Sequence, residues 1–154
     1  QLAPIGEVTS KGFEIDLTTD ITPDWVLLVN YGYNDTKITG TAEGQAVTNA
    51  VGDRFANAPK HKVGFWTRYQ VPAIGAAFAF GGEHVSRRIS LSGQTVKPYT
   101  IFDASITKGL GFAELLLRVD NIFDKVYAAS GFSAQSGHFP GEPRTFLAEL
   151  RFKF

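Results

Sequence analysis

The chain contains no cysteine, no methionine and no excess of either charge. The missing cysteine excludes a disulfide framework and the thiolate zinc sites. Because 15 basic and 15 acidic side chains cancel, the composition does not favour a nucleic-acid partner. No apolar run approaches the roughly 18 residues of a membrane helix. If the chain lies in a membrane, it must form a barrel, because only helices and closed barrels satisfy their backbone groups in lipid.

The residues that are abundant favour β-structure. Aromatic residues make up 13% of the chain, with 13 Phe, and there are 16 Gly; aromatic side chains suit a pleated surface. Seven stretches are predicted as strands. Each has the nine or so residues that a tilted membrane strand needs, whereas soluble strands usually have about five or six. The predicted strands cover residues 12–20, 25–35, 61–71, 76–87, 99–108, 112–123 and 145–154.

The connections between these stretches alternate between short and long. Short turns are expected at residues 21–24, 72–75 and 109–111, and long segments at 36–60, 88–98 and 124–144. Outer-membrane barrels have this pattern of brief periplasmic turns and extended extracellular loops. By that rule the last strand is expected to end at the periplasmic side. The chain begins at Gln1 without a secretory signal pattern, so we expect a processed protein or a fragment.

Alternation with a period of two is the main physical signal. In the last stretch Phe146 and Leu150 share one face, and Glu149 and Arg151 share the other. The same parity places the mid-strand charges of five stretches on one face. A Lys or Arg that faces lipid at the midplane costs about 2–4 kcal/mol, so an uncharged face is what a barrel exterior requires. Lys108 breaks the pattern, but at a strand end, where its long side chain can reach water.

Aromatic residues near the strand ends favour a membrane barrel over a soluble sheet. A soluble antiparallel sheet also alternates, with its apolar face on a core. The strand lengths, the alternating connections and the aromatic residues at both expected interfaces together indicate the barrel. The predicted girdle residues are Tyr31, Tyr33, Tyr69, Tyr99, Phe112, Phe152 and Phe154.

Five motifs, in order and at matching spacing, resemble the family of TonB-dependent outer-membrane receptors. Residues 121–127 (NIFDKVY) resemble that family's N-[LI]-F-D-K-x-Y segment, and residues 140–144 (PGEPR) its G-x-P-R start of the final strand. Residues 12–16 (GFEID) and 57–61 (NAPKH) resemble its G-x-E and N-x-P-x-H segments. The last strand is similar to the signal that the barrel-assembly machinery reads. The motif residues towards the C-terminus are Asn121, Phe123, Asp124, Tyr127, Gly141, Pro143, Arg144 and Phe154.

The resemblance implies an all-β fold, an antiparallel transmembrane barrel of about 22 strands around a globular plug. Residues 1–154 would be its final third, with the plug domain and the TonB-binding box absent. The implied function is uptake of a ferric siderophore across the bacterial outer membrane, energised by the TonB complex through the missing N-terminal part. Outer-membrane lipid and, through the C-terminal strand, the barrel-assembly machinery are the other implied partners. Neither a cofactor nor an enzymatic activity is expected.

Ligand contacts, under this resemblance, are expected in the extracellular loops. Arg87 and Arg88 would suit an anionic ferric chelate. Four residues of the last loop would offer aromatic stacking: Tyr127, Phe132, His138 and Phe139. Each of these residues also has a simpler interpretation as a solvated or loop-packing side chain. The histidines have no metal-ligand spacing, and no catalytic arrangement is recognisable.

The motif residues also have interpretations that need no family. Asn121 and Asp124 are expected to turn the chain at a strand end. Gly141 is expected to supply a positive φ ahead of Pro143, whose ring fixes the angle at which the chain reaches the last strand. Arg144 is expected to pair with a carboxylate at the barrel rim.

Two alternatives remain open from the sequence. One is a complete small outer-membrane barrel of eight strands. Its eighth strand would have to come from residues 1–10, which contain Pro4 and Gly6 and alternate poorly, so this segment is interpreted as the end of a loop. The other is a soluble β-barrel or sandwich that binds a small apolar ligand, which predicts solubility without detergent.

Overall fold

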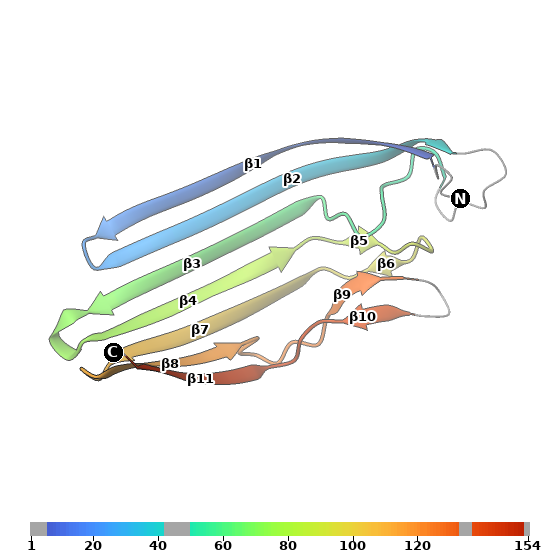
Figure 1. The fold of residues 1–154 in the computed structure, drawn as a ribbon. Helices are drawn as coiled ribbons and strands as arrows, with labels where there is room; N and C mark the ends of the chain where they lie inside the picture. The colour runs from blue at the N-terminus through green and yellow to red at the C-terminus, as the bar shows by residue number, and fades with distance from the viewer. Residues whose placement is uncertain (1–5, 42–49, 133–136, 153–154) are drawn as a thin grey trace.

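A computed structural model describes residues 6–41, 50–132 and 137–152 of the chain. In these residues seven long strands form one antiparallel sheet in the order β1-β2-β3-β4-β7-β8-β11 (Figure 1). The predicted all-β fold is confirmed, and the predicted terminal Phe154 lies outside the described residues. The long strands are β1 (Gly6–Thr22), β2 (Trp25–Thr41), β3 (His61–Val71), β4 (Ala76–Val85), β7 (Tyr99–Gly109), β8 (Ala113–Asp120) and β11 (Thr145–Phe152).

Two of the long connections contain short hairpins that the sequence did not predict. β5 (Arg88–Ile89) pairs with β6 (Thr95–Val96), and β9 (Ala128–Gly131) pairs with β10 (His138–Pro140). One turn of 3-10 helix, η1 (Pro72–Ile74), joins β3 to β4. Across the described ranges, no helix is long and apolar enough to cross a membrane.

Several predicted strand boundaries are wrong, and β2 continues to Thr41, six residues beyond its predicted end at residue 35. β1 begins at Gly6, so the interpretation of residues 6–10 as a loop fails, because β2 runs beside them and supplies their backbone partners. β8 ends at Asp120 rather than at residue 123, because Asn121 has a φ of 51°, which a strand cannot accommodate. β4 ends at Val85, two residues early. All of these errors lie at strand ends, where the period-two alternation no longer distinguishes strand residues from loop residues.

The short connections gather at one end of the sheet and the long connections at the other (Figure 1). β1 and β2 are joined through Pro23 and Asp24, where the proline ring presets the turn. η1 is closed by Gly75, whose φ of 59° is left-handed and whose N–H donates to the carbonyl of Pro72. Gly111, with a φ of 81°, makes the turn between β7 and β8. The predicted alternation of short and long connections is therefore confirmed.

The pairing register separates apolar from polar side chains. On the polar face the charges occur in pairs: Lys62 lies 2.7 Å from Glu83, and Arg151 lies 2.6 Å from Glu149. On the opposite, apolar face one row crosses all seven strands of the described sheet without a charge. That row is Thr19, Leu27, Thr67, Phe80, Ala104, Val119 and Phe146.

The apolar face has no second layer over it within the described residues (Figure 1). Its large side chains are therefore exposed; Phe13 is 54% and Phe146 is 75% accessible. The buried apolar side chains of the described residues are small: Ala56, Ala76, Ala77, Val85, Val96 and Ala113. An apolar surface of this extent is stable only against lipid or another apolar layer.

Aromatic clusters flank the apolar face at both ends. At the long-loop end Phe13 stacks on Tyr33 at 5.6 Å, and Tyr33 lies 5.4 Å from the ring of His61. At the short-turn end Trp25 meets Tyr69 edge-on at 6.4 Å. Tyr33 and Trp25 are eight residues apart on β2 (33 minus 25), about 27 Å at about 3.4 Å per residue. Before tilt, this matches the apolar band of an outer-membrane barrel, about 25 Å tall.

Tyr99 is an exception among the predicted girdle residues. Its hydroxyl donates to the carboxylate of Glu83 at 3.2 Å, which places it on the polar face. Phe112 and Phe152 do lie together, with ring centres 6.3 Å apart, at the short-turn end. Lys108 donates to a carbonyl of the η1 turn, as expected for a lysine at a strand end.

Candidate functional site

The candidate site lies at the long-loop end of the sheet (Figure 1). We call residues 50–60 the first loop, residues 86–98 the second loop, and residues 121–132 with 137–144 the third loop. The second loop contains the β5–β6 hairpin and the third contains the β9–β10 hairpin. All six predicted ligand-contacting residues belong to the second and third loops: Arg87, Arg88, Tyr127, Phe132, His138 and Phe139.

Asn121 closes the base of the third loop. The residue is 3% exposed and left-handed, which asparagine tolerates better than most residues. Its side-chain amide donates to the carbonyls of Lys125 at 2.9 Å and Glu142 at 3.0 Å, and its Oδ1 accepts from the N–H of Lys125 at 2.8 Å. Its own N–H donates to Asp103 on β7 at 2.8 Å. The first residue of the NIFDKVY motif thus ties both arms of the loop to the sheet.

Asp124 and Arg144 connect the two arms a second time. The Asp124 carboxylate accepts from the backbone N–H of Arg144 at 3.0 Å. The Arg144 guanidinium donates to the carbonyl of Ile122 at 3.4 Å and lies over the ring of Phe146 at 5.8 Å. Among the described residues, a backbone contact therefore replaces the ion pair expected for Arg144. Both left-handed motif residues, Asn121 and Asp124, turn the chain as predicted.

Gly141 is required for a reason different from the predicted one. Its φ is not in the positive range, so that prediction is wrong. A Cβ at this position would lie 2.0 Å from the ring of Tyr127, so only glycine lets the ring pack there. The Gly141 N–H also donates to the Tyr127 carbonyl at 2.8 Å. Tyr127 in turn lies 4.3 Å from the ring of Tyr99, and burial raises the pKa of the Tyr127 phenol.

The two remaining motif residues lie at the surface. Phe123 is 73% exposed and meets Phe102 of β7 edge-on at 5.8 Å. Pro143 is exposed, and its carbonyl accepts from the hydroxyl of Thr145 at 3.1 Å, at the first residue of β11. Both positions fit a structural role at the long-loop end of the sheet.

The adjacent arginines Arg87 and Arg88 have opposite surroundings. Arg87 is exposed, whereas Arg88 is 5% exposed. The Arg88 guanidinium donates to the carbonyls of Ala128, at 2.8 Å, and Ala129 in the third loop, and it lies 5.4 Å from the ring of Tyr99. A ligand role for either arginine remains a prediction, and Arg87 is the accessible one.

The tip of the third loop carries an aromatic pair. Phe132 and Phe139 meet edge-on at 6.1 Å and are 44% and 56% exposed. His138 lies between them in the sequence, opposite Gly131 in the hairpin, and is exposed. The structure therefore brings Phe132 and Phe139 together, whereas His138, the preceding strand residue, points to the other face of the hairpin; stacking of any of the three on a ligand remains a prediction.

A hollow of about 450 Å³ lies between the second and third loops. Two lysines in its wall come from different loops: Lys97, which the sequence analysis did not single out, and Lys125, which it quoted only as part of the NIFDKVY motif. His138 and Tyr127 are the predicted ligand residues that the hollow brings together. The rest of its lining is Thr95, Pro98, Val126, Ala128 and Pro140. Two cations with aromatic and hydroxyl groups beside them suit an anionic ligand.

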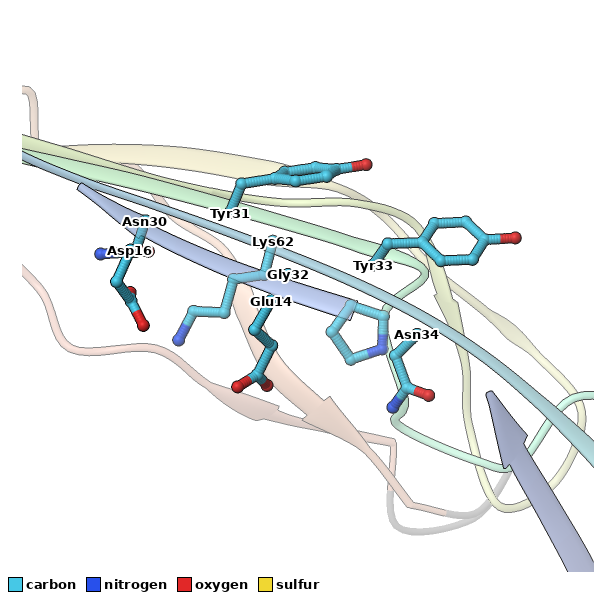
Figure 2. A pocket seen from close by; sticks show the side chains of 9 residues that line it. Glu14, Asp16, Asn30, Tyr31, Gly32, Tyr33, Asn34 and Lys62 are labelled. Carbon is cyan, nitrogen blue, oxygen red and sulfur yellow. The ribbon is translucent and has the colours of Figure 1, made fainter. Parts of the chain in front are cut away.

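A second hollow, of about 350 Å³, lies on the polar face of the sheet. Figure 2 shows the side chains of Glu14, Asp16 and Lys62 on one side of β1 and β2, and those of Tyr31 and Tyr33 on the other. Carboxylates outnumber the lysine here, which makes this hollow a weaker candidate for an anion. In the described ranges, no cluster of three or more His, Cys, Asp or Glu is arranged to hold a metal ion.

Comparison with protein families gives a match over most of the chain. A family model described as "TonB dependent receptor-like, beta-barrel" matches residues 1–122. The ferrichrome outer membrane transporter/phage receptor of Escherichia coli K12 is 27% identical over 159 residues, which cover 97% of this chain and 20% of that protein. The catecholate siderophore receptor Fiu of the same strain is 29% identical, with the same coverage. The ferrioxamine receptor of Yersinia enterocolitica is 26% identical over 98% of this chain and 22% of its own length.

Solved structures give the same picture of the fold. The ferric-catecholate import receptor Fiu of E. coli K12, in its closed form, superposes with a TM-score of 0.80 at 25% identity, over 97% of this chain and 21% of the other. The siderophore receptor PiuA of Acinetobacter baumannii also has a TM-score of 0.80, at 24% identity, over 97% of this chain and 22% of the other. The chain spans about a fifth of the length of the curated relatives it matches.

Proposed function

The chain belongs to the family of TonB-dependent receptor β-barrels, and we propose that its strands form the C-terminal part of a receptor that takes up a ferric siderophore. Uptake is energised through TonB. The plug domain and the TonB-binding segment of the whole protein would lie outside these 154 residues. The strands lie in the bacterial outer membrane, where their apolar face meets lipid.

One observation carries this proposal. Relatives named for ferrichrome, catecholate siderophores and ferrioxamine each align with 97–98% of the chain, so the alignment includes the loops as well as the strands. The relatives are receptors and transporters, and we propose that the chain has no catalytic site. The exposed apolar face and the resemblance to large receptors do not favour a soluble carrier or a small complete barrel.

We place part of the ligand surface at the hollow between the second and third loops. Lys97 and Lys125 bring two positive charges to its wall. An iron(III) tris-catecholate has a net negative charge, whereas an iron(III) tris-hydroxamate is neutral. The charge of the hollow therefore favours the catecholate class. The barrel-assembly machinery is proposed to recognise the last strand during insertion.

The function is tested by iron uptake in the organism that encodes the chain. Deletion of the gene is expected to abolish TonB-dependent uptake of radioactive iron supplied as its tris-catecholate complex and to leave uptake of the ferrichrome complex unchanged. Unchanged uptake of both complexes would refute the siderophore proposal. An antibody to the last strand is expected to detect an outer-membrane band several times heavier than 16.8 kDa; detection only in the soluble fraction would contradict the membrane assignment.

The placement of the ligand is tested by charge reversal in the full-length receptor. Lys125→Glu is expected to weaken binding of the iron(III) tris-catecholate about tenfold or more, since a charged hydrogen bond is replaced by repulsion. Lys11→Glu, an exposed lysine on β1 far along the sheet order, is the matched control and should leave affinity unchanged. Equal affinity of both variants and the parent would exclude this hollow from the ligand surface.

A further inference from the structure

We propose that Asn57 and Arg88 are positioning residues that lock the three loops into one unit and so hold the hollow in its ligand-binding shape. This inference rests on the proposed function, because it concerns the same hollow. Neither side chain lines that hollow. Both act through the backbone of the third loop.

Asn57 joins the first loop to the other two. Its side-chain amide and the backbone of Gly131 form a reciprocal pair: Nδ2 donates to the Gly131 carbonyl at 2.9 Å, and the Gly131 N–H donates to Oδ1 at 2.8 Å. The Asn57 N–H donates to the carbonyl of Ile89 in the second loop at 2.7 Å. The residue is held left-handed, with a φ of 57°. One asparagine therefore satisfies backbone groups in two loops that are distant in the sequence.

Arg88 joins the second loop to the third. Its guanidinium donates to the carbonyls of Ala128 and Ala129, three and two residues before Gly131 in β9, and packs against Tyr99. Arginine is suited to this role because its planar group presents several donors in a fixed fork. A buried guanidinium also retains the loop strongly, since withdrawing the carbonyls would leave an uncompensated charge out of water.

A small core lies under these polar contacts. Val96 is fully buried and Ser90 is 1% exposed, and they are the largest fully buried side chains of the described residues. Both lie against Gly131: a Cβ added there would be 2.6 Å from Ser90 Cβ and 2.6 Å from Val96 Cγ2. The largest fully buried side chains of the described residues thus lie between the second and third loops, away from the long strands.

The consequence for the hollow follows from its walls. Thr95 and Lys97 come from the second loop, while Lys125, Tyr127 and His138 come from the third. The separation of the two lysines is therefore set by how firmly the loops are joined. When the joined loops hold these wall residues in place before binding, the ligand does not have to order them. The entropic cost of binding is then lower, and the affinity is higher. Arg88 and Asn57 supply that order without touching the ligand.

The test uses the full-length receptor with Arg88→Met, Arg88→Lys and Asn57→Asp. Asn57→Asp replaces the Nδ2 donor with a carboxylate oxygen that faces the Gly131 carbonyl, keeps the oxygen that accepts from the Gly131 N–H, and keeps a residue type that tolerates positive φ. Gln94→Ala, an exposed amide side chain in the same β5–β6 hairpin, is the matched control. Hydrogen exchange of the amides of residues 128–131 is measured without ligand. Affinity and maximal uptake rate are measured with the iron(III) tris-catecholate, per receptor assembled in the outer membrane.

For Arg88→Met we expect about tenfold or faster exchange at residues 128–131 and about tenfold weaker affinity, from the loss of charged hydrogen bonds. The maximal uptake rate per assembled receptor should not change, whereas a general folding defect would reduce it. Arg88→Lys should fall between Arg88→Met and the parent, because it keeps the charge and loses the fork. Asn57→Asp should shift exchange and affinity in the same direction, and Gln94→Ala should shift neither.

Three outcomes separate this inference from the proposed function. If Lys125→Glu weakens binding while Arg88→Met and Asn57→Asp do not, the hollow is the ligand site and the lock is overturned. If the lock variants speed exchange at residues 128–131 and leave affinity unchanged, the positioning role is likewise overturned. If the parent receptor does not bind the tris-catecholate, the charge argument of the proposed function fails. Hydrogen exchange at residues 128–131 then still decides whether Asn57 and Arg88 join the loops.

Discussion

The long strands and the loop cluster of this chain are stabilised in opposite ways. In the strands, large apolar side chains such as Phe146 stay exposed, and no layer in the described residues covers them. In the loops, Val96 and Ser90 are almost fully buried and Arg88 is enclosed. The difference shows which contacts supply the folding free energy of each region. The strands depend on lipid and on neighbouring strands, whereas the loops carry their own small core and polar contacts.

A charge on the apolar face should have the largest effect, because that face depends on lipid. Leu17→Arg is expected to lower the free energy of unfolding by about 2–4 kcal/mol in the full-length receptor. Thr18→Arg, one residue along β1 and on the polar face, is the control and should cost at most about 1 kcal/mol. Urea unfolding in lipid vesicles measures both. Equal costs for the two variants would show that Leu17 does not face lipid.

Loss of the Asn121 side chain should have the next largest effect, at the base of the third loop. Asn121→Gly keeps the left-handed backbone and leaves three backbone groups without their partner, at a cost of about 2–3 kcal/mol to loop stability. Asn121→Ala should cost about 1 kcal/mol more, because alanine resists positive φ. Protease cleavage within residues 121–144 measures the opening. Parent-like resistance of both variants would contradict the role of Asn121.

Gly141→Ala tests the packing of Tyr127 and should cost about 1–3 kcal/mol, since the new methyl would overlap the ring. Tyr127→Ala should cost a comparable amount by itself. The double variant should cost less than the sum of the two, because removal of the ring clears the space for the methyl. Strictly additive costs would mean that the ring and the glycine do not compete for the same volume.

A polar-face ion pair should matter least. Lys62 and Glu83 are 2.7 Å apart, but their side chains are 53% and 32% exposed. Lys62→Gln is therefore expected to change the free energy of unfolding by no more than about 1 kcal/mol, and less at high salt. Urea unfolding at low and high salt measures this. Removing one partner of a buried ion pair costs about 3 kcal/mol or more. A loss of that size for Lys62→Gln would mean that this pair is shielded from water, which its exposure in the sheet contradicts.

Sequence reasoning predicted the strands better than the site. The parity of charges, the positions of the long strands and the turn positions were predicted because each depends on residues close together in the chain. Tyr99 was assigned to the wrong face, since it stands at a strand end and aromatic residues suit either face there. Gly141 was correctly singled out but for the wrong reason, because its contact with Tyr127 appears only when both arms of the loop meet.

The amino-acid sequence by itself determined that this chain forms long antiparallel strands with one charged and one apolar face, joined by turns and loops in alternation. A period of two is a local property, so it can be read along the chain. Only the tertiary structure decided which of two adjacent arginines is enclosed, that Asn57 reaches Gly131, and that Lys97 and Lys125 share one hollow. These relations join residues from separate loops, and no local pattern encodes the distance between them.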